Sequence, residues 1–335
     1  MTMDRVLTGI TTTGTPHLGN YAGAIRPAVA ASKARDVESF FLVADYHSLV
    51  KGQDPDQVAQ STLEIAASWL ATGLDTESIF YRQSDVAEIM ELTWILTCMS
   101  AKGLMNRAHA YKAAVAENEA SENKDPDKGI TMGLFCYPIL MAADILIFKA
   151  NKIPVGKDQV QHVEMARDIA GRFNHRYGEI LVLPEAVVGK STAVLPGLDG
   201  RKMSKSYGNT IPLFAEEKQL RKLIMRIKTN SQEPGEPKDP DSSSLFAIYS
   251  AFASREETEA MRARYAEGIA WGEMKTELFE YLNEHLRAAR EEYRRLLAAP
   301  DHVEDVLQQG AQRAVAISGP VLTEIREAVG IRHLG

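Results

Sequence analysis

Residues 39–50 read SFFLVADYHSLV, and this stretch decides the fold class. It is an almost continuous apolar run, which is typical of a strand buried on both faces of a parallel sheet. Strand-like segments also occur at RVLTGIT (5–11) and SIFYRQS (78–84), and helical patterns separate the three. The resulting β-α-β-α-β order predicts an α/β fold with a doubly wound, Rossmann-like parallel sheet. Ligands of such sheets bind at the carboxyl ends of the strands.

The rest of the chain divides into two parts of different character. The first part has apolar helical stretches, a polar stretch without pattern at 116–129 that is predicted to be a loop, and a short strand at 151–156. Its expected helices cover 21–34, 54–74, 86–100, 130–150 and 157–176. Beyond residue 212 the chain is charge-rich and helical, interrupted by the Pro- and Ser-rich stretch 231–244. We therefore predict an α/β domain over 1–205 and a C-terminal all-helical domain over 206–335.

Composition narrows the classes of protein to which this sequence can belong. Hydrophobic residues make up 45% and charged residues 25% of the 335, as in ordinary globular proteins. No apolar run reaches membrane-spanning length, and the N-terminus MTMDRVLTGI is a poor signal peptide. The net charge of −7 argues against nucleic-acid binding over the whole surface, but not against a local basic face. Cys98 and Cys136 have no CxxC partner, which argues against a disulfide framework or a metal centre and fits a reducing cytoplasm.

Two short segments have the composition of phosphate-binding loops. TTTGTPHLGN (11–20) joins the first strand to a helix, and its small residues let a ligand approach the backbone N–H groups at the helix start. It lacks the GxGxxG pattern, and on its shape alone a tight turn capped by His17 is the simpler interpretation. RKMSKSYGNT (201–210) combines three cations with two hydroxyls and a glycine in an acidic chain. Taken alone, it too is more simply a solvated basic turn.

In this order, on either side of a βαβ pattern, the two segments resemble the signatures of class I aminoacyl-tRNA synthetases. PHLGN matches the HIGH signature of that family, with His17 and Asn20 at its outer positions, and 202–206 matches the KMSKS loop letter for letter. Within the family, the chain is similar to the bacterial tryptophanyl members. The further matching stretches are GNYAGA (19–24), YPILMAADIL (137–146) and VGKDQVQHVEMARDIAGRFN (155–174). The resemblance covers essentially the whole chain and is thinnest in the last third.

The resemblance implies an enzyme that activates L-tryptophan with ATP and transfers it to tRNA(Trp). In adenylation a carboxylate attacks the α-phosphate and pyrophosphate leaves, so negative charge grows on the leaving group. Lys202 and Lys205 are three residues apart, and one turn could point both ammonium groups at this charge. Ser204 and Ser206 could hydrogen-bond phosphate or cap the loop, and the flanking glycines suggest a loop that closes over ATP. Catalysis would consist of positioning and charge stabilisation, with no covalent protein intermediate.

By the same resemblance, His17 and Asn20 would contact the ATP phosphates, His17 as either a neutral or a charged donor. Gly156 and Asp158 would meet the ribose, and Leu195 would offer its backbone to adenine. The full set expected to bind ATP is Thr11, Thr12, Thr13, Gly19, Asn20, Gly156, Lys157, Asp158, Leu195, Lys202, Met203, Ser204, Lys205 and Ser206. Here the chain departs from many bacterial relatives, which carry Gln at the position of Thr11.

Asp144 is the candidate determinant of amino-acid specificity. It lies among apolar neighbours in LMAADILIF, where a carboxylate is costly unless it is paired or binds a ligand. A buried Arg or Lys partner would make it structural. In the tryptophanyl family the matching Asp accepts the indole N–H, so a substrate without that donor is penalised. The other expected substrate contacts are Gly9, His47, Tyr137, Met141 and Gln159. Gln159 would meet the amino group or the carboxylate of the amino acid. A core histidine is an equally good interpretation of His47, and a helix-start residue is an alternative interpretation of Gln159.

The remaining expectations concern metals and partners. No His, Cys or carboxylate cluster has metal-ligand spacing, so Mg²⁺ is expected to arrive bound to ATP rather than held by the protein. Basic runs occur at RKLIMRIK (221–228), RARYAEG (262–268) and RAAREEYRR (287–295). Such runs are usually solvated helix faces, whereas in the resembling family this domain reads the tRNA anticodon. Family members are homodimers, so a homodimer is implied as well.

Three other functions stay open at this point. A tyrosyl-tRNA synthetase has a similar architecture and the same signatures, and only the surroundings of Asp144 favour indole. A nucleotidyltransferase that adenylates a small acid without tRNA would leave the C-terminal helical domain without an obvious role. A non-catalytic synthetase paralogue that binds RNA or an amino acid predicts decay of the signatures, whereas KMSKS is intact.

Overall fold

The computed structural model describes residues 3–52, 54–121, 125–188 and 194–334. At its centre is a five-stranded sheet in which every neighbouring pair of strands is parallel. The strands are β1 (Asp4–Thr11), β2 (Val37–Ala44), β3 (Ile79–Arg82), β4 (Lys152–Pro154) and β5 (Glu185–Val187). Their spatial order is β3-β2-β1-β4-β5, so the chain first adds β2 and β3 on one side of β1 and then adds β4 and β5 on the other side. The prediction of a doubly wound parallel sheet is confirmed.

Helices cover both faces of this sheet. They are α1 (Leu18–Asn20), α2 (Arg26–Ser32), α3 (Pro55–Ala71), α4 (Glu88–Met99), α5 (Lys102–Met105), α6 (His109–Ala120), α7 (Met132–Leu146) and α8 (Val160–Tyr177). A π-helical segment, η1 (Tyr21–Ile25), joins α1 to α2, and the 3-10 turns η2 (Tyr46–Lys51), η3 (Gln83–Asp85) and η4 (Lys157–Gln159) follow β2, β3 and β4. One face of the sheet packs against α2 and α3, and the other packs against α4, α7 and α8.

The apolar run in β2 shows how one strand serves two cores. Phe40, Leu42 and Ala44 pack with α4, α7 and α8, whereas Phe41 and Val43 pack with α2 and α3. Successive side chains of a strand point to opposite faces of the sheet. A strand with helices on both sides therefore needs apolar residues at consecutive positions, and that is what its sequence has.

Three strands differ from the sequence-based expectation. The expected strand over 39–50 ends at Ala44, because the Asp45 carboxylate accepts the Tyr46 N–H at 3.0 Å and caps the 3-10 turn η2. The strand expected to reach residue 84 ends at Arg82, where η3 begins. Strand β5 was not predicted, because three residues are too short to show a period.

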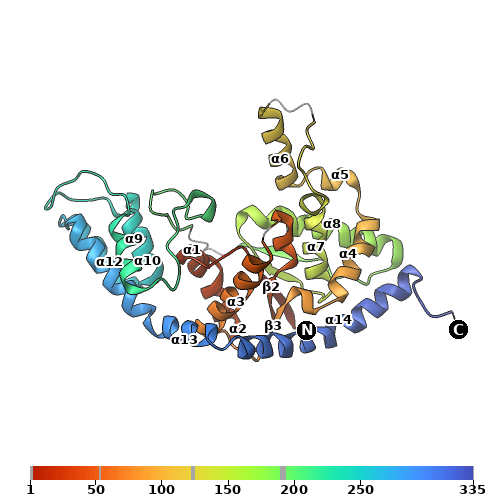
Figure 1. Ribbon diagram of the computed structural model, residues 1–335. Coiled ribbons are helices and arrows are strands. Elements are labelled where there is room, and N and C mark those ends of the chain that lie inside the picture. The colour runs from red at the N-terminus through yellow and green to blue at the C-terminus, as the bar shows by residue number, and fades with distance from the viewer. Residues whose placement is uncertain (1–2, 53, 122–124, 189–193, 335) are drawn as a thin grey trace.

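The prediction of a loop over 116–129 is wrong for its first part, because α6 continues to Ala120. None of the residues in α6 is buried, so this helix has no apolar face that a periodicity argument could detect. The Asn118 amide donates to the carbonyl oxygens of Pro126 (2.8 Å) and Lys128 (2.9 Å), which holds the returning segment against the helix. Figure 1 shows α6 projecting from the body of the molecule. Residues 122–124 lie outside the described residues.

The chain after residue 205 is helical, as expected. Its elements are η5 (Lys205–Tyr207), α9 (Glu217–Met225), η6 (Pro240–Ser242), α10 (Ser244–Phe252), α11 (Arg255–Ala266), α12 (Trp271–His285), α13 (Arg287–Leu297) and α14 (Pro300–Val329). The core around α2 and α3 continues without interruption into α9–α13, and α9, α10 and α12 lie in the lobe on the left of Figure 1. Among the described residues, the helices are too short or too polar to cross a membrane.

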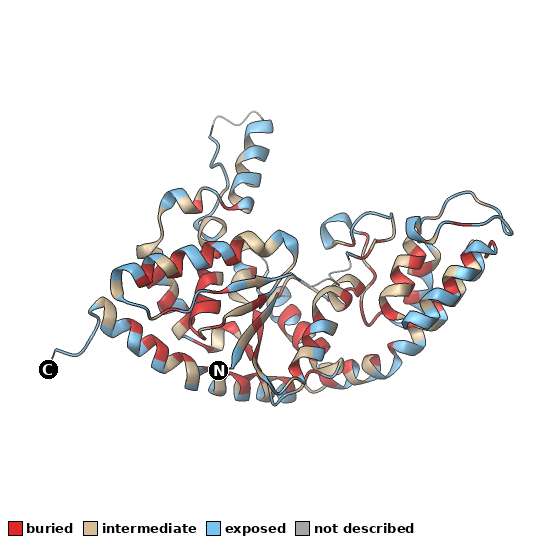
Figure 2. Ribbon diagram, turned by 180° about the vertical axis from the view of Figure 1, so that it is seen from behind, coloured by how far each residue is buried: buried red, intermediate tan, exposed pale blue. Residues whose placement is uncertain are grey.

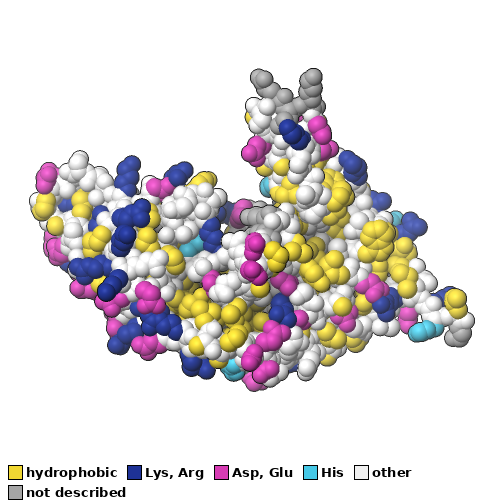
Figure 3. Space-filling model, in the orientation of Figure 1, with side chains coloured by type: hydrophobic (Ala, Val, Ile, Leu, Met, Phe, Trp, Pro, Cys, Tyr) yellow, Lys and Arg dark blue, Asp and Glu magenta, His cyan; other side chains and the backbone are white. Residues whose placement is uncertain are grey.

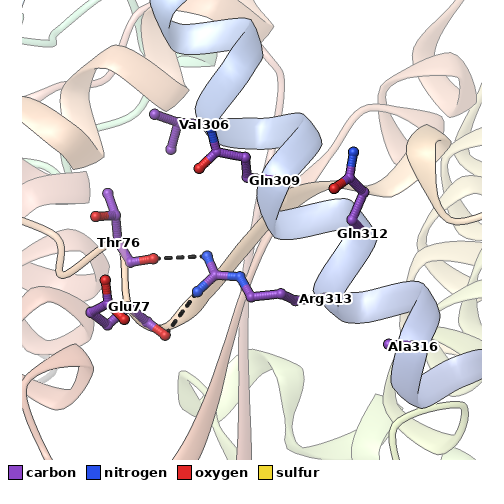
Figure 4. Close-up of a pocket in the computed structure, with 7 residues that line it drawn as sticks. All are labelled: Thr76, Glu77, Val306, Gln309, Gln312, Arg313 and Ala316. Atoms are coloured by element: carbon purple, nitrogen blue, oxygen red, sulfur yellow. Dashed lines mark hydrogen bonds between the residues drawn. The ribbon is translucent and has the colours of Figure 1, made fainter.

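Helix α14 runs back beneath the sheet and packs on β3 and α4 (Figure 1). A Cβ on Gly310 would lie 1.6 Å from the carbonyl oxygen of Phe80, so only glycine permits this approach of helix to strand. The Arg313 guanidinium donates to the carbonyl oxygens of Thr76, Glu77 and Ser78 and lines a cavity of about 480 Å³ (Figure 4). Buried positions recur along the helix (Figure 2). The predicted division into two domains at 205/206 stays a prediction, although α14 contributes to the core beside β3.

Candidate active site

The predicted functional residues follow the carboxyl ends of neighbouring parallel strands. The threonine and HLGN turn follows β1, η2 with His47 follows β2, and η4 with Asp158 and Gln159 follows β4. Asp144 lies in α7, which packs on the same face of the sheet as α4 and α8. The topology therefore gathers residues from distant parts of the sequence at one edge of the sheet. The cavity beside Arg313 lies at the opposite edge, where Thr76–Ser78 precede β3.

The HLGN turn is a helix cap. His17 Nδ1 accepts the Asn20 N–H at 3.3 Å, and the Asn20 side-chain oxygen accepts the His17 N–H at 3.0 Å. A Cβ on Gly19 would lie 3.0 Å from His17 Nδ1, so glycine leaves room for the ring. Burial, together with the Lys205 ammonium, lowers the pKa of His17 to about 4, so the ring is neutral at pH 7. The cap leaves His17 Nε2 and the Asn20 amide nitrogen as the atoms that could face a ligand.

The three threonines of the turn have different surroundings. Thr11 is exposed at the end of β1, and Thr13 is partly exposed. Thr12 is fully buried, and its hydroxyl pairs with Ser48, whose own hydroxyl also donates to the Thr12 carbonyl oxygen at 2.9 Å. The Thr12 side chain thus joins the turn to η2, and the Thr12 N–H donates to the Ala44 carbonyl oxygen at 3.5 Å.

The KMSKS loop is seated directly on this turn. Lys205 Nζ donates to the carbonyl oxygens of Thr13 (2.9 Å) and Gly14 (2.7 Å). Behind the loop, Leu18 N–H donates to the Ile211 carbonyl oxygen at 3.0 Å, and Leu213 N–H donates to that of Pro16 at 2.9 Å. The two signatures, about 190 residues apart in sequence, are therefore joined by backbone and side-chain hydrogen bonds.

The internal shape of the loop differs from the expected single turn. Met203 N–H donates to the Leu195 carbonyl oxygen at 2.8 Å, and Lys202 pairs with Pro196 in an extended bridge. The 3-10 turn η5 begins only at Lys205. Lys202 and Lys205 are consequently not on one turn, although both side chains are exposed. The interpretation from three-residue spacing is wrong, because the backbone at 202–204 is extended.

One buried amide fixes this loop. Asn209, 3% exposed, accepts the Ser204 N–H at 2.9 Å and donates to Asp199 Oδ1 (2.7 Å) and the Lys202 carbonyl oxygen (3.1 Å). A Cβ on Gly197 would lie 2.4 Å from the Asn209 side chain. Ser204 and Ser206 pair through their hydroxyls at 2.9 Å. Gly208 has a φ of +61°, which closes the loop after the serines.

Asp144 is buried, and its hydrogen-bond partners are His47 and Gln83 rather than an Arg or a Lys. It is 2% exposed; Oδ2 lies 2.9 Å from His47 Nε2, and Oδ1 accepts from the Gln83 amide at 2.7 Å. Burial raises the pKa of Asp144, and the hydrogen bonds from His47 and Gln83 oppose that rise. The fold thus brings His47 into contact with Asp144. The carboxylate retains lone pairs for a further donor.

A second chain of hydrogen bonds lies beside the first. Tyr137 Oη lies 2.8 Å from His162 Nε2, and His162 Nδ1 lies 2.8 Å from Gln159 Oε1. The rings of His47 and Tyr137 meet edge to face with centroids 6.3 Å apart. Through these contacts four of the residues around the expected pocket form one connected group: Asp144, His47, Tyr137 and Gln159.

The remaining predicted residues are less constrained. Lys157 and Asp158 are exposed in η4, and a Cβ on Gly156 would lie 2.7 Å from Asp158 Oδ1. Met141 is partly buried, and Gly9 is exposed in β1 with Leu42 beside it. Among the described residues, His, Cys, Asp and Glu side chains do not gather in groups of three that could hold a metal ion.

Sequence reasoning missed three residues that hold this site together: Gln83, Ser48 and His162. Each is polar and buried. Gln83 and Ser48 follow the ends of strands, and His162 lies inside the matching stretch 155–174. Polar residues just beyond apolar strands were therefore the available signal.

Comparisons with known proteins show which proteins this chain is similar to. A family model described as tRNA synthetases class I (W and Y) matches residues 3–287. A tryptophan–tRNA ligase of Pseudomonas aeruginosa is 64% identical over 335 residues, covering 98% of this chain and 74% of that protein. One from Neisseria meningitidis is 57% identical, with both chains covered completely. The crystal structure of tryptophanyl-tRNA synthetase from Campylobacter jejuni, complexed with ADP and tryptophan, has a TM-score of 0.87 at 43% identity, covering 97% of this chain and 99% of that one.

Proposed function

The chain belongs to the class I tRNA synthetases of the tryptophan and tyrosine group, and we propose that within this group it is a tryptophan–tRNA ligase. The family predicted from the two signatures is thereby confirmed. The enzyme activates L-tryptophan with ATP to tryptophanyl-adenylate and pyrophosphate, and then transfers tryptophan to the terminal ribose of tRNA(Trp). The observation that carries the proposal is the buried Asp144 carboxylate in a chain 57–64% identical to tryptophan–tRNA ligases.

Asp144 would discriminate between tryptophan and tyrosine. Its partners His47 and Gln83 fix the carboxylate, so its remaining lone pairs point in a defined direction. An indole N–H is a donor without acceptor capacity, which suits a carboxylate. A substrate that lacks this donor would leave a buried acid without its partner, and such losses are severe.

Adenylation would be driven by charge stabilisation. An oxygen of the tryptophan carboxylate attacks the α-phosphorus of ATP, the bond to the bridging oxygen breaks, and pyrophosphate leaves with the electron pair. Lys205 already lies on the turn that would hold the phosphates, and Lys202 is exposed in the same loop. The ammonium groups would meet the charge as it grows on the pyrophosphate. His17 would act as a neutral donor through Nε2, because burial keeps its pKa near 4.

The ATP molecule would bring its own Mg²⁺, held by phosphate oxygens, which are the ligands that this ion prefers. The ribose would meet Asp158 and the backbone at Gly156 at the carboxyl end of β4. Thr11, Thr13 and Gly19 would line the phosphate side of the nucleotide. The exposure of these residues supports this arrangement.

The first test is ATP–pyrophosphate exchange with each of the twenty amino acids. We expect exchange with tryptophan alone. Exchange with tyrosine would keep the mechanism and overturn the assignment of Asp144. Exchange with no amino acid would favour a transferase without tRNA or a non-catalytic paralogue, and RNA binding would decide between those two.

The enzyme would act as a homodimer through the outer face of α4. Met90 and Trp94 are 42% and 69% exposed, and with the exposed Cys98 they follow one another at four-residue spacing along this helix. Met132, at the start of α7, is 70% exposed. Figure 3 shows hydrophobic side chains gathered over this side of the molecule. Sedimentation velocity should give twice the mass of one chain for the wild type and the mass of one chain for Trp94→Glu. A monomeric wild type would contradict the proposal.

The C-terminal domain over 206–335 would bind tRNA in the cytoplasm. Most arginines of the predicted basic runs are paired within the fold, such as Arg264 with Glu273 and Arg294 with Glu216. Lys218 and Lys222 of α9 are exposed, in the lobe where Figure 3 shows basic side chains. Charge reversal of both lysines should raise the KM for tRNA and leave ATP–pyrophosphate exchange unchanged. An unchanged KM for tRNA would exclude this face.

A further inference from the structure

A buried histidine connects two of the expected substrate contacts. His162 is 3% exposed in α8, with Nε2 2.8 Å from Tyr137 Oη and Nδ1 2.8 Å from Gln159 Oε1. We propose that His162 is a positioning residue. It accepts a hydrogen bond from the Tyr137 hydroxyl, so that the Tyr137 oxygen can accept a hydrogen bond from the α-ammonium group of the amino acid. This inference rests on the proposed function, because it assigns the end of tryptophan that Asp144 does not contact.

The direction of each hydrogen bond follows from a carboxylate at one end of the chain. The Gln159 amide nitrogen lies 3.4 Å from Asp158 Oδ2, and an ionised carboxylate can only accept. The nitrogen of the amide therefore faces Asp158, and its oxygen faces His162. An amide oxygen can only accept, so His162 Nδ1 must carry the proton. In a neutral imidazole Nε2 is then an acceptor, and the Tyr137 hydroxyl must donate to it.

The surroundings of His162 and Tyr137 favour the protonation states that these hydrogen-bond directions require. Burial lowers the pKa of His162, and His109 of α6 and His47 of η2 act in the same direction. Asp158 of η4 acts in the opposite direction, but the net result is a neutral ring at pH 7. Burial also raises the pKa of Tyr137, so its hydroxyl keeps the proton that His162 accepts.

The consequence is a pocket with a defined polarity at each end. A Tyr137 hydroxyl that donates its hydrogen bond to His162 offers only lone pairs to the pocket, and an ammonium group offers only donors. With the opposite hydroxyl orientation, a proton would face the ammonium and repel it. Tyr137 also meets the His47 ring, which holds Asp144. The two ends of a tryptophan molecule would thus be met by acceptors from two hydrogen-bond chains that are in contact through the His47 and Tyr137 rings.

The test compares two ligands and three variants by calorimetry on the full chain. The ligands are tryptophan and indole-3-propionate, which lacks the ammonium group. His162→Phe keeps a ring but removes both hydrogen bonds, and it should weaken tryptophan binding about 10- to 100-fold. It should change indole-3-propionate binding by less than about threefold, because no ammonium contact is lost. His162→Gln, which offers one donor and one acceptor, should recover most of the affinity for tryptophan.

The control is His285→Phe, the same change at a ring that contacts Phe252 and Tyr281 in the helical lobe. It should leave both affinities unchanged. Tyr137→Phe, which removes the accepting oxygen itself, should reproduce the selective loss of tryptophan and serves as the second measurement if His162→Phe does not fold.

The outcomes separate this inference from the proposed function. Equal losses for both ligands in His162→Phe and Tyr137→Phe would reduce His162 to a packing residue and overturn the inference. Unchanged tryptophan binding in these variants would also overturn it, while exchange by the wild type would leave the proposed function in place. A wild type that neither binds tryptophan nor supports exchange with it would remove the proposed function and this inference together.

Discussion

The amino-acid pocket and the phosphate-binding loops lie at the same edge of the sheet, but they are built in opposite ways. In the pocket, buried side chains bond to one another: Asp144 to His47 and Gln83, and Tyr137 to His162. In the loops, the exposed Lys205 donates to the backbone carbonyl oxygens of Thr13 and Gly14. The pocket residues lie on the helices α7 and α8 and on the 3-10 turns η2, η3 and η4, whereas the KMSKS loop is extended chain followed by one short turn.

The difference matches the two tasks. Selecting one amino acid requires polar groups that cannot relax when the wrong substrate enters, so they are buried and paired. Stabilising a charge that appears only during the reaction requires cations that can move from one set of acceptors to another. Lysines on an exposed loop have that freedom, and the present partners of Lys205 are carbonyl oxygens that a phosphate can replace.

The largest expected effect is that of a substitution in the phosphate-binding loops alone. Lys205→Ala should slow adenylation about 10²- to 10³-fold, because one stabilising cation is lost from the transition state. The dissociation constant of tryptophan should stay within about twofold, since the pocket is separately built. Exchange kinetics and calorimetry measure the two quantities, and Lys218→Ala on α9 is the matched control. Normal turnover in Lys205→Ala would remove this lysine from the mechanism.

The next largest effect is that of a substitution in the amino-acid pocket alone. Asp144→Asn keeps the volume but removes the charge, and it should weaken tryptophan binding about 10- to 100-fold while the KM for ATP changes little. Thermal unfolding should be followed in parallel, because His47 and Gln83 lose a charged partner. Equal losses for tryptophan and ATP would make Asp144 a structural residue.

A third change tests the packing of α14 against β3. Gly310→Ala would force a methyl group against the Phe80 carbonyl oxygen and should lower the free energy of unfolding by about 1–3 kcal/mol. Gly171→Ala in α8, where a Cβ meets nothing within 4 Å, should be neutral or stabilise by up to about 1 kcal/mol. Urea unfolding of both variants measures the contrast. A stable Gly310→Ala protein would mean that α14 can move away from β3 without cost.

The last change concerns acid and tests the charge state of the phosphate-binding turn. The pKa of His17 is lowered to about 4 in the folded protein, against 6.5 for the free side chain. The unfolded chain therefore binds more protons between these values, so the stability contributed by neutral His17 is complete above pH 6.5 and is lost as the pH falls towards 4. His17→Asn, which can still cap the helix, should lose less stability than the wild type between pH 7 and 4.5. Parallel losses in urea unfolding would show that His17 does not titrate on unfolding.

Particular elements show where prediction from the sequence stopped. Strands β1, β2 and β3 were found because their apolar runs are local signals, whereas β5 and the exposed helix α6 carry no such signal. The KMSKS letters located a loop, yet their spacing gave the wrong relation between Lys202 and Lys205. Asp144 was found as a buried acid, but its partners Gln83 and His47 could not be chosen from among the polar residues of the chain.

The sequence by itself determined the fold class, the two signatures and the identity of the candidate residues, because these depend on patterns within a few neighbouring residues. The tertiary structure alone decided how those residues act. The contacts that matter join positions 61 residues apart (Gln83 and Asp144), 97 apart (His47 and Asp144) and 192 apart (Thr13 and Lys205). Only the folded chain brings these groups together and removes them from water, and burial then sets their charge and the direction of each hydrogen bond.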